Sequence, residues 1–504
     1  MVDLRFTPRL IARIAQALIV ITLAAAEATA AVPLGPEGAQ HLLTRAGFAP
    51  SPAEVLAFAP LTQTQAVDRL LAGVRTTASA PPPQWIGDPV IGPREFRSLP
   101  EESQKAERQR NVRRSLDLRR WWLEEMVGTP SPLTERMTLF WHNRFVSAQP
   151  KVRWPQLMYR QNVLLRQNAV GNFRVLLHAI ARDPAMIVYL DSATNRRGRP
   201  NENFAREVME LFVLGRGHYT EQDIKEAARA FTGFSLDPDT LAFVYRPGIH
   251  DDGTKSVLGV RGPLDGDRVL DALLEEPAAA EFIVGKLWLE FVSPRPDPVR
   301  VAVIATRFRS SGYDIRTALR GVLMQPELVA AGEDDLLVKS PVELLVGLVR
   351  QGDGRLPNAT GAAVAVAAMG QNLFSAPNVR GWPGGEAWIN TQSLLVRKQS
   401  IERALARPEA AAREARAMLP SADAPPAGNP KQLLEAAQVM AAEVDPAAML
   451  KSYRLQPERP LAADDIQRLA GGLLVVAPVS QPVPGTLAYD ALRALLLDPA
   501  YQLK

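Results

Sequence analysis

Residues 199–212 read RPNENFAREVMELF, and this stretch is typical of a buried helix. At about 100° per residue, apolar side chains cover most of the helical circumference; they are Phe204, Ala205, Val208, Met209, Leu211, Phe212 and Val213. The polar side chains share one narrow stripe, which holds Asn203, Arg206, Glu207 and Glu210. Because a helix that is apolar nearly all the way round is largely buried, we expect this stripe to face either an internal ion-pair network or the floor of a crevice.

Glu207 differs from the other charged residues of the stripe. Arg206 follows Glu202 by four residues, in the favourable order for an ion pair, whereas Glu207 has no basic residue at a helical neighbour position. A buried carboxylate beside a like charge has a raised pKa, and such groups gather at active sites. Two interpretations stay open: Glu207 is a catalytic group, or it forms a structural ion pair with an arginine of another helix, such as Arg136, Arg144 or Arg229.

Residues 131–145 predict a second helix of the same kind, with apolar side chains around most of its surface. Its polar stripe holds Glu135, Thr138 and His142. Since Thr138 and His142 are four residues apart, the hydroxyl could hold the imidazole in one tautomer, as a general base or a metal ligand requires. The other interpretation is a histidine that is simply hydrogen-bonded in the core. On another side of this helix, Arg136 is placed to meet Glu207 or Glu210.

Signals for helix starts recur along the chain and indicate a mainly α fold, a large multi-helix body with a small β-hairpin insertion. Capping boxes begin at Ser51, Ser340 and Thr220, and an Asp-Pro start lies at 183–184. The strongest strand signal is 241–246, which we expect to pair with 256–258 through the turn at 250–253.

The amino terminus predicts export. Three arginines precede an apolar run at 14–26, and Ala28-Thr29-Ala30 follows as a cleavage signal, so residues 1–30 are typical of a secretory signal peptide. We expect general secretory export to the periplasm or the medium, with an uncleaved anchor as the alternative. No later apolar run is long enough to span a membrane.

Composition shifts divide the mature chain further. We expect a helical body at 31–418, with an extended proline-rich insertion at 73–100. A Pro-, Ala- and Asp-rich linker at 419–430 precedes a C-terminal helical segment at 431–504.

Composition also excludes several classes of function. The net charge is only +4, and no basic run is interleaved with aromatic residues, so nucleic acid is not an expected partner. There is no cysteine, so a divalent metal would require His, Asp and Glu ligands. The sequence contains no phosphate-binding loop, dinucleotide fingerprint, nucleophile elbow or HExxH motif.

The candidate site therefore rests on the two polar stripes and on residues expected near them. His218 precedes the cap at Thr220, His250 and Asp251 suit a metal or a base, and Trp382 could pack internally or stack on a sugar. The predicted catalytic residues are His142, Glu207 and Glu210. The predicted substrate-binding residues are Asn143, Asn203, Arg206, His218 and Trp382. A divalent metal, if one is bound, is assigned to His142, Glu207, Glu210, His250 and Asp251.

Eight phrases in order resemble bacterial domain-of-unknown-function family 1800; they are HLLTRAGF at 41–48, LFWHNRF at 139–145, GNFRVLL at 171–177, PNENFAREVMELFVLG at 200–215, YTEQDIKEAARAFTG at 219–233, HDDGTKSVLG at 250–259, KSPVE at 339–343 and NVRGWPGGEAW at 378–388. The closing DPAYQLK is similar to the family's usual end. The resemblance implies an exported bacterial protein without an established reaction, often encoded beside a second exported family. One departure is Arg144, where the family's motif commonly has a second histidine, and this weighs against a two-histidine metal site.

Two functions follow as expectations. The first is an envelope hydrolase-like enzyme that uses carboxylate and histidine acid-base chemistry, with or without a divalent metal. The alternative is a non-catalytic binding or assembly factor that acts with another exported protein, in which the polar stripes only lock helices together.

Overall fold

A computed structural model describes residues 32–330, 332–352, 356, 358–405 and 444–504. The predicted signal peptide and the linker at 419–430 lie outside the described residues, as do residues 431–443 of the predicted C-terminal segment. Among the helices that are described, none combines the length and the apolar character needed to cross a bilayer.

The chain is mainly α-helical, as the sequence predicted, and most of its helices pack around a first hydrophobic core. The helices of this core are α2 (Gly35–Ala46), α3 (Pro52–Phe58), α4 (Gln63–Ala72), α7 (Pro132–Arg144), α9 (Phe173–Ala181), α10 (Pro184–Tyr189), α11 (Asn203–Glu207), the π-helix η3 (Val208–Val213), α12 (Glu221–Ala230), α13 (Gly266–Glu275), α14 (Pro277–Phe291), α15 (Pro298–Ser310) and α16 (Ile315–Leu323).

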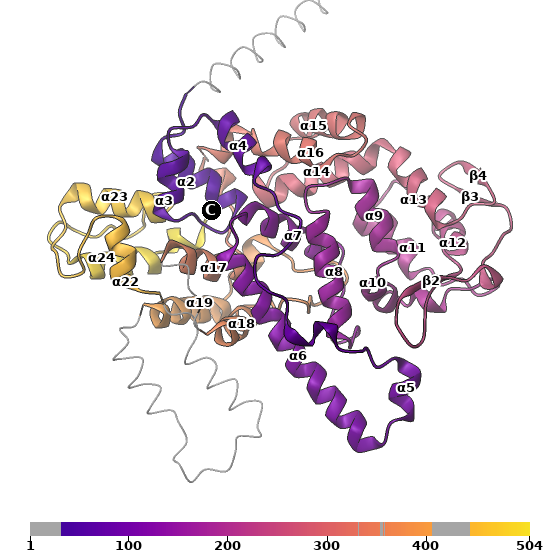
Figure 1. Cartoon of the computed structure of the whole chain (residues 1–504). Helices are drawn as coiled ribbons and strands as arrows, with labels where there is room; N and C mark the ends of the chain where they lie inside the picture. Colours follow the sequence, from indigo (N-terminus) through magenta and orange to yellow (C-terminus); the bar gives the residue numbers. More distant parts are fainter. Residues whose placement is uncertain (1–31, 331, 353–355, 357, 406–443) are drawn as a thin grey trace, which may run out of the picture.

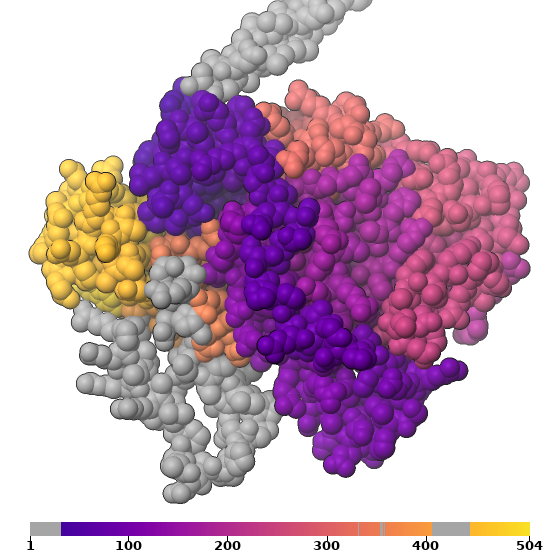
Figure 2. Space-filling model, in the orientation of Figure 1, coloured from indigo at the N-terminus to yellow at the C-terminus, as the bar shows by residue number. Residues whose placement is uncertain are grey.

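A second core joins the middle of the chain to its C-terminal part. Its helices are α6 (Glu101–Gly128), α8 (Pro155–Gln167), α17 (Pro341–Gln351), α18 (Ala359–Ala368), α19 (Thr391–Ala404), α22 (Pro446–Ser452), α23 (Ala463–Leu473) and α24 (Ala488–Leu497). Figure 2 shows α22–α24 in yellow at one side of the molecule, against the indigo N-terminal helices. The C-terminal segment therefore shares its core with the helical body.

Helix α7 contributes side chains to both cores and so connects them. Trp141 and Met137 face the first core, and Leu139 faces the second. Trp141 is fully buried, and its indole nitrogen donates to the carbonyl oxygen of Ala169 at 2.9 Å. Because large side chains cover this helix on several sides, its few polar groups have fixed positions.

The predicted helix starts are confirmed. Ser51, Ser340 and Thr220 each close a capping box, and Asp183 accepts from the backbone N–H of Met186 at 2.9 Å. The predicted closing helix is α24, followed by the 3₁₀ turn η8 (Pro499–Gln502). Other 3₁₀ turns are η2 (Ser192–Thr194), η4 (Pro247–Ile249), η5 (Pro326–Leu328), η6 (Glu333–Asp335) and η7 (Gly385–Trp388).

The predicted pairing of 241–246 with 256–258 is wrong. The structure contains two separate antiparallel hairpins, β1 (Phe234–Leu236) with β2 (Phe243–Tyr245) and β3 (Lys255–Val257) with β4 (Val260–Gly262). The turn between β3 and β4 has positive φ at both Leu258 and Gly259, which suits a two-residue hairpin loop. Each strand therefore pairs with its nearest neighbour in sequence.

The insertion at 73–100 is irregular for most of its length, but it also contains η1 (Gln84–Gly87) and the short helix α5 (Pro93–Ser98). It lies along α6, where the carboxylate of Glu125 accepts from the backbone N–H groups of Ser79 and Ala80 at 2.7 and 2.6 Å. In Figure 1, α5 lies beside the projecting end of α6.

Candidate functional site

The stripe identified from the sequence lies on a helix that changes its winding. The α-helical turns of α11 continue into the π-helix η3, whose end is marked by the hydrogen bond from Leu214 N–H to the carbonyl oxygen of Met209 at 3.0 Å. Isolated π-helical turns are rare and often occur at functional sites. The predicted burial is confirmed, because Phe204, Val208 and Phe212 are all buried.

Two charged residues of the stripe form ion pairs. Arg206 pairs with Glu202 at 3.1 Å, as predicted, and also with Glu221 at 2.8 Å. Glu210 accepts from Nε of Arg216 at 2.7 Å and lies 3.9 Å from a terminal nitrogen of Arg380. The charges of Arg206 and Glu210 are therefore both compensated by ion pairs.

Glu207 has no such partner. Within the described part of the chain, its carboxylate forms no hydrogen bond and no ion pair. Burial and the charge of Glu210 raise its pKa, and the more distant charges of Arg206 and Arg380 only partly oppose this shift. Burial raises the pKa of Tyr189, and the charge of Glu207 raises it further. The half-buried carboxylate is thus poised to exchange a proton.

The predicted meeting of Arg136 with Glu207 or Glu210 is wrong. Arg136 pairs instead with Glu343 at 2.6 Å and with Glu290 at 2.7 Å. Its side chain is only 2% exposed, so its charge depends on these carboxylates. Of the other two arginines considered, Arg229 pairs with Glu226 and Asp251 near the hairpins, and Arg144 has no carboxylate within 4.0 Å among the described residues.

His142 lies in an aromatic cage. Its ring centroid is 5.1 Å from those of Trp122 and Phe374 and 5.7 Å from that of Trp382. Burial lowers its pKa to about 3, and its Nε2 accepts from the backbone N–H of Phe374 at 3.3 Å. The imidazole is therefore neutral at physiological pH. Thr138 donates to the carbonyl oxygen of Thr134 at 2.8 Å instead of holding the ring.

Asn143 anchors the glycine-rich turn of the 378–388 segment. Its Oδ1 accepts from the backbone N–H of Trp382 at 2.7 Å. Trp382 is 4% exposed and packs with Val146 and Trp388, so internal packing accounts for its ring. This contact joins α7 to residues more than 230 positions later in the chain.

A crevice opens where α7, α14 and the 379–385 segment meet. It consists of a cavity of about 420 Å³ and an adjoining cavity of about 330 Å³, which share Asn143, Arg144, Lys286 and Arg380. Glu210 lines the smaller cavity. The larger one reaches a buried charge cluster formed by Arg136, Glu290, Glu343 and Lys504.

The shared wall of the crevice carries positive charge that is only partly compensated. Neither Arg144 nor Lys286 has a carboxylate within 4.0 Å among the described residues, and the buried Nε of Arg144 has no hydrogen-bond partner there. Glu290, which lines the larger cavity, acts on Arg144 only from a greater distance. Burial and the charge of Arg144 lower the pKa of Lys286. The nearest carboxylate to Arg380 is Glu210, at 3.9 Å. Such a surface favours an anion, which would satisfy all three cations.

The remaining predicted site residues lie elsewhere. Asn203 and His218 are exposed, and neither lines the crevice. His250 contacts Thr232, and Asp251 pairs with Arg229 at 2.8 Å, so both stabilise the hairpin region. Where side chains are described, no group of three or more His, Asp or Glu residues is arranged to hold a metal ion. Of the predicted site residues, Asn143, Glu210 and Trp382 therefore line the crevice, and Glu207 is close enough to Glu210 for their charges to interact. The five residues assigned to a metal do not come together in the described structure.

Sequence reasoning did not identify the cations as a site. Arg144 was considered only as a possible partner of Glu207 and as a departure from a motif. Lys286 offered a clearer signal, because it is a single lysine in the apolar run of α14, which reads PAAAEFIVGKLWLEF. Arg380 lies in a loop, and only the docking of its turn on Asn143 brings it to α7.

The fold and site together define a helical protein with a cation-lined crevice at the junction of two cores. The chain belongs to the family described as "Protein of unknown function (DUF1800)", whose profile matches residues 41–503. Phrases that carry the resemblance meet in space: 139–145 contacts 378–388, and 339–343 contacts the closing residues 498–504. Neither the curated proteins nor the solved structures contain a match.

Replacing Glu207 with glutamine is expected to leave the protein as stable as the parent at pH 7, or more stable. The folded-state pKa of Glu207 lies above its ordinary value of 4.5, so the cost of ionising it is present above that pKa and disappears as the pH falls below 4.5. The advantage of Glu207→Gln should therefore shrink between pH 7 and pH 4.5 in thermal unfolding. Glu202→Gln, which removes a partner of Arg206, is the control and should show no such gain. A clear loss of stability at pH 7 would reveal a cation that holds Glu207.

Proposed function

We propose that this exported protein binds an anionic ligand in the crevice. One observation carries the proposal: in the described structure, no carboxylate lies within ion-pairing distance of Arg144 or Lys286. Both residues line a cavity that is large enough for a small molecule. Carboxylate, phosphate and sulfate groups suit an arginine fork with a neighbouring lysine. Because the crevice is partly shielded from water, charge pairing there is stronger than on an open surface.

The test is the thermal stability of the protein in inorganic pyrophosphate against sodium chloride at equal ionic strength. A ligand that binds only the folded state adds about 2.7 kcal/mol of stability at 100 times its Kd. We expect a saturable rise in Tm with pyrophosphate. Lys286→Met should lose most of this rise without losing basal stability, since it also relieves repulsion with Arg144.

Lys105→Met is the matched control, because Lys105 is exposed on α6 and lies outside the crevice. This variant should keep the whole pyrophosphate effect. Equal rises in Tm for the parent protein and for Lys286→Met would refute anion binding in the crevice.

A second candidate function is an envelope hydrolase acting on an anionic substrate. The observation that favours it is Glu207, which has a raised pKa, lacks a partner in the described structure and lies beside Glu210. A carboxylate of this kind can accept a proton from water or return one to a leaving group. A divalent metal could assist, but the proposal does not depend on it. Glu207→Gln should then abolish turnover of anionic esters or amides while the fold stays intact; unchanged turnover would remove Glu207 from this role.

We also propose export to the periplasm or medium and action with another exported protein. The basic residues, apolar run and cleavage signal of residues 1–30 support export. Protein recovered from the periplasm should begin near Ala31 by intact-mass measurement. Recovery of membrane-bound protein that retains Met1 would indicate an anchor instead.

A further inference from the structure

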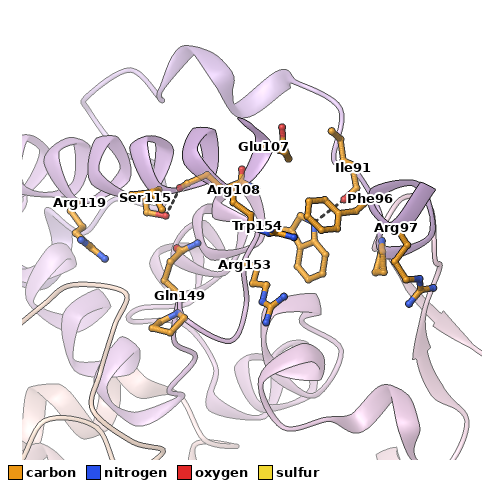
Figure 3. A pocket seen from close by; sticks show the side chains of 14 residues that line it. Ile91, Phe96, Arg97, Glu107, Arg108, Ser115, Arg119, Gln149, Arg153 and Trp154 are labelled. Atoms are coloured by element: carbon orange, nitrogen blue, oxygen red, sulfur yellow. Dashed lines mark hydrogen bonds between the residues drawn. The ribbon is translucent and has the colours of Figure 1, made fainter. Parts of the chain in front are cut away.

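A separate cavity, of about 730 Å³, lies between α5, residues 107–119 of α6 and the 149–154 segment (Figure 3). Its volume falls within the range of about 300 to 1,000 Å³ that is typical of small-molecule sites. The hydrogen bond from the indole nitrogen of Trp154 to the carbonyl oxygen of Ile91, at 2.9 Å, fixes the insertion to the start of α8. The insertion is therefore held in place where it forms one wall of the cavity.

One end of this cavity holds most of its apolar surface. Figure 3 shows Ile91, Phe96 and Trp154 there, with the cationic side chain of Arg97 beside Phe96. Val112 of α6 also lines the cavity. The guanidinium of Arg108 lies over the ring of Phe96, 5.4 Å from its centroid.

The other end is polar and cationic. Arg119, Ser115 and Gln149 lie there in Figure 3, with Arg153 between the two ends. Arg119 donates through Nε to the carbonyl oxygen of Leu373 at 3.1 Å, which orients the guanidinium and leaves its terminal nitrogens available. Gln149 is 9% exposed, and its amide oxygen has no hydrogen-bond partner among the described residues.

The charges lining the cavity do not balance. Its four arginines are Arg97, Arg108, Arg119 and Arg153, and none has a carboxylate partner within the described chain. Among the described residues that line it, Glu107 is the only acidic one, and it pairs with Arg110 at 2.8 Å. A ligand that fits must therefore combine negative charge with an apolar surface.

We propose that this cavity binds an amphipathic anion, an apolar body that carries one carboxylate or phosphate. The anionic group lies against the guanidinium groups of Arg119 and Arg153, where charge-assisted hydrogen bonds are available. The apolar body lies along Trp154 and Phe96, where its burial removes hydrocarbon from water. The site is independent of the crevice, since the two cavities share no residue.

The experiment is isothermal titration of the mature protein with decanoate, decyl phosphate and decanol below their aggregation concentrations. Decanoate and decyl phosphate should bind with one-to-one stoichiometry, and decanol at least tenfold more weakly. Arg119→Met should weaken decanoate binding at least tenfold. Arg153→Met should weaken it severalfold, and because Arg153 is exposed this variant tests the site without risk to the fold.

Arg113→Met is the matched control, because Arg113 is exposed on α6 and does not line the cavity. It should bind decanoate like the parent protein, and so should Lys286→Met, which separates this site from the crevice. Equal affinity for decanol and decanoate, or full affinity in both Arg119→Met and Arg153→Met, would overturn the proposal. Tighter binding of an acidic peptide than of decanoate would also overturn it, in favour of a protein partner.

Discussion

Glu343→Gln should be among the most destabilising single changes in this protein. Its carboxylate is 5% exposed and pairs with Arg136 at 2.6 Å and with Lys504. Removing one partner of a buried ion pair leaves the others uncompensated and costs about 3 to 5 kcal/mol. Glutamine keeps a side-chain oxygen that accepts from the backbone N–H of Ser340. The loss of stability therefore comes from the removed charge and not from a lost helix cap. The measurement is chemical unfolding at pH 7.

The pH dependence of this deficit has a definite sign. Burial opposes ionisation of Glu343, but Arg136 and Lys504 overcome it and lower the pKa to about 2. The stabilisation is therefore fully present above the ordinary value of 4.5 and is lost as the pH falls through about 2. Glu343 also raises the pKa values of its buried neighbours Lys339 and Lys504, which burial lowers to about 7 and about 8. Without Glu343 these two lysines are harder to protonate in the folded state, so the deficit of Glu343→Gln should be at least as large at pH 5 as at pH 7.

Glu275→Gln provides a control in which the same chemical change removes a surface ion pair. Glu275 pairs with Arg268 at 2.8 Å, and both side chains are about half exposed. Such pairs contribute about 0 to 1 kcal/mol. A deficit for Glu343→Gln that is no larger than this would mean that the buried cluster does not hold α7 to α17.

Gly381→Ala should be the second severe change. Gly381 has φ of +80°, and a Cβ there would lie 2.2 Å from Oδ1 of Asn143 and 2.6 Å from its carbonyl oxygen. The left-handed conformation costs about 1 to 2 kcal/mol for a residue with a Cβ, and overpacking adds about 1 to 3 kcal/mol. We expect a total loss of about 2 to 5 kcal/mol, and displacement of the turn that carries Arg380 into the crevice.

Gly385→Ala separates the two contributions. Gly385 has φ of +57° in the same segment, but a Cβ there meets no atom within 4 Å. This variant should lose only the conformational part. If thermal unfolding gives equal losses for Gly381→Ala and Gly385→Ala, the turn does not dock tightly on Asn143.

The helices were predictable because their signals are local. Capping residues, proline at the first turn and apolar periodicity lie within a few positions of one another, and Ser51, Ser340 and Thr220 begin helices as expected. The burial of 204–213 followed from the same periodicity. The hairpins were mispaired because the strands are three residues long and carry little pattern of their own.

The site was predictable only in part. The missing local cation at Glu207 was visible from sequence spacing, and the structure adds no distant partner among the described residues. The π-helical turn was not predictable, because its side chains fit an ordinary helix equally well. The grouping of Arg144, Lys286 and Arg380 depends on three segments that meet only after folding, so no spacing rule could reveal it.

The central claim is that an anion compensates the positive charge of the crevice, and the pKa of Lys286 tests it most directly. ¹³C-dimethylated lysines can be titrated by NMR, with Lys286→Met assigning the signal. In the free protein Lys286 should titrate below its ordinary value of 10.5, because of burial and the charge of Arg144. Saturating pyrophosphate should raise this pKa, since a ligand that prefers the charged form shifts the proton equilibrium by the same coupling free energy. An unchanged pKa of Lys286 in saturating pyrophosphate would contradict the account.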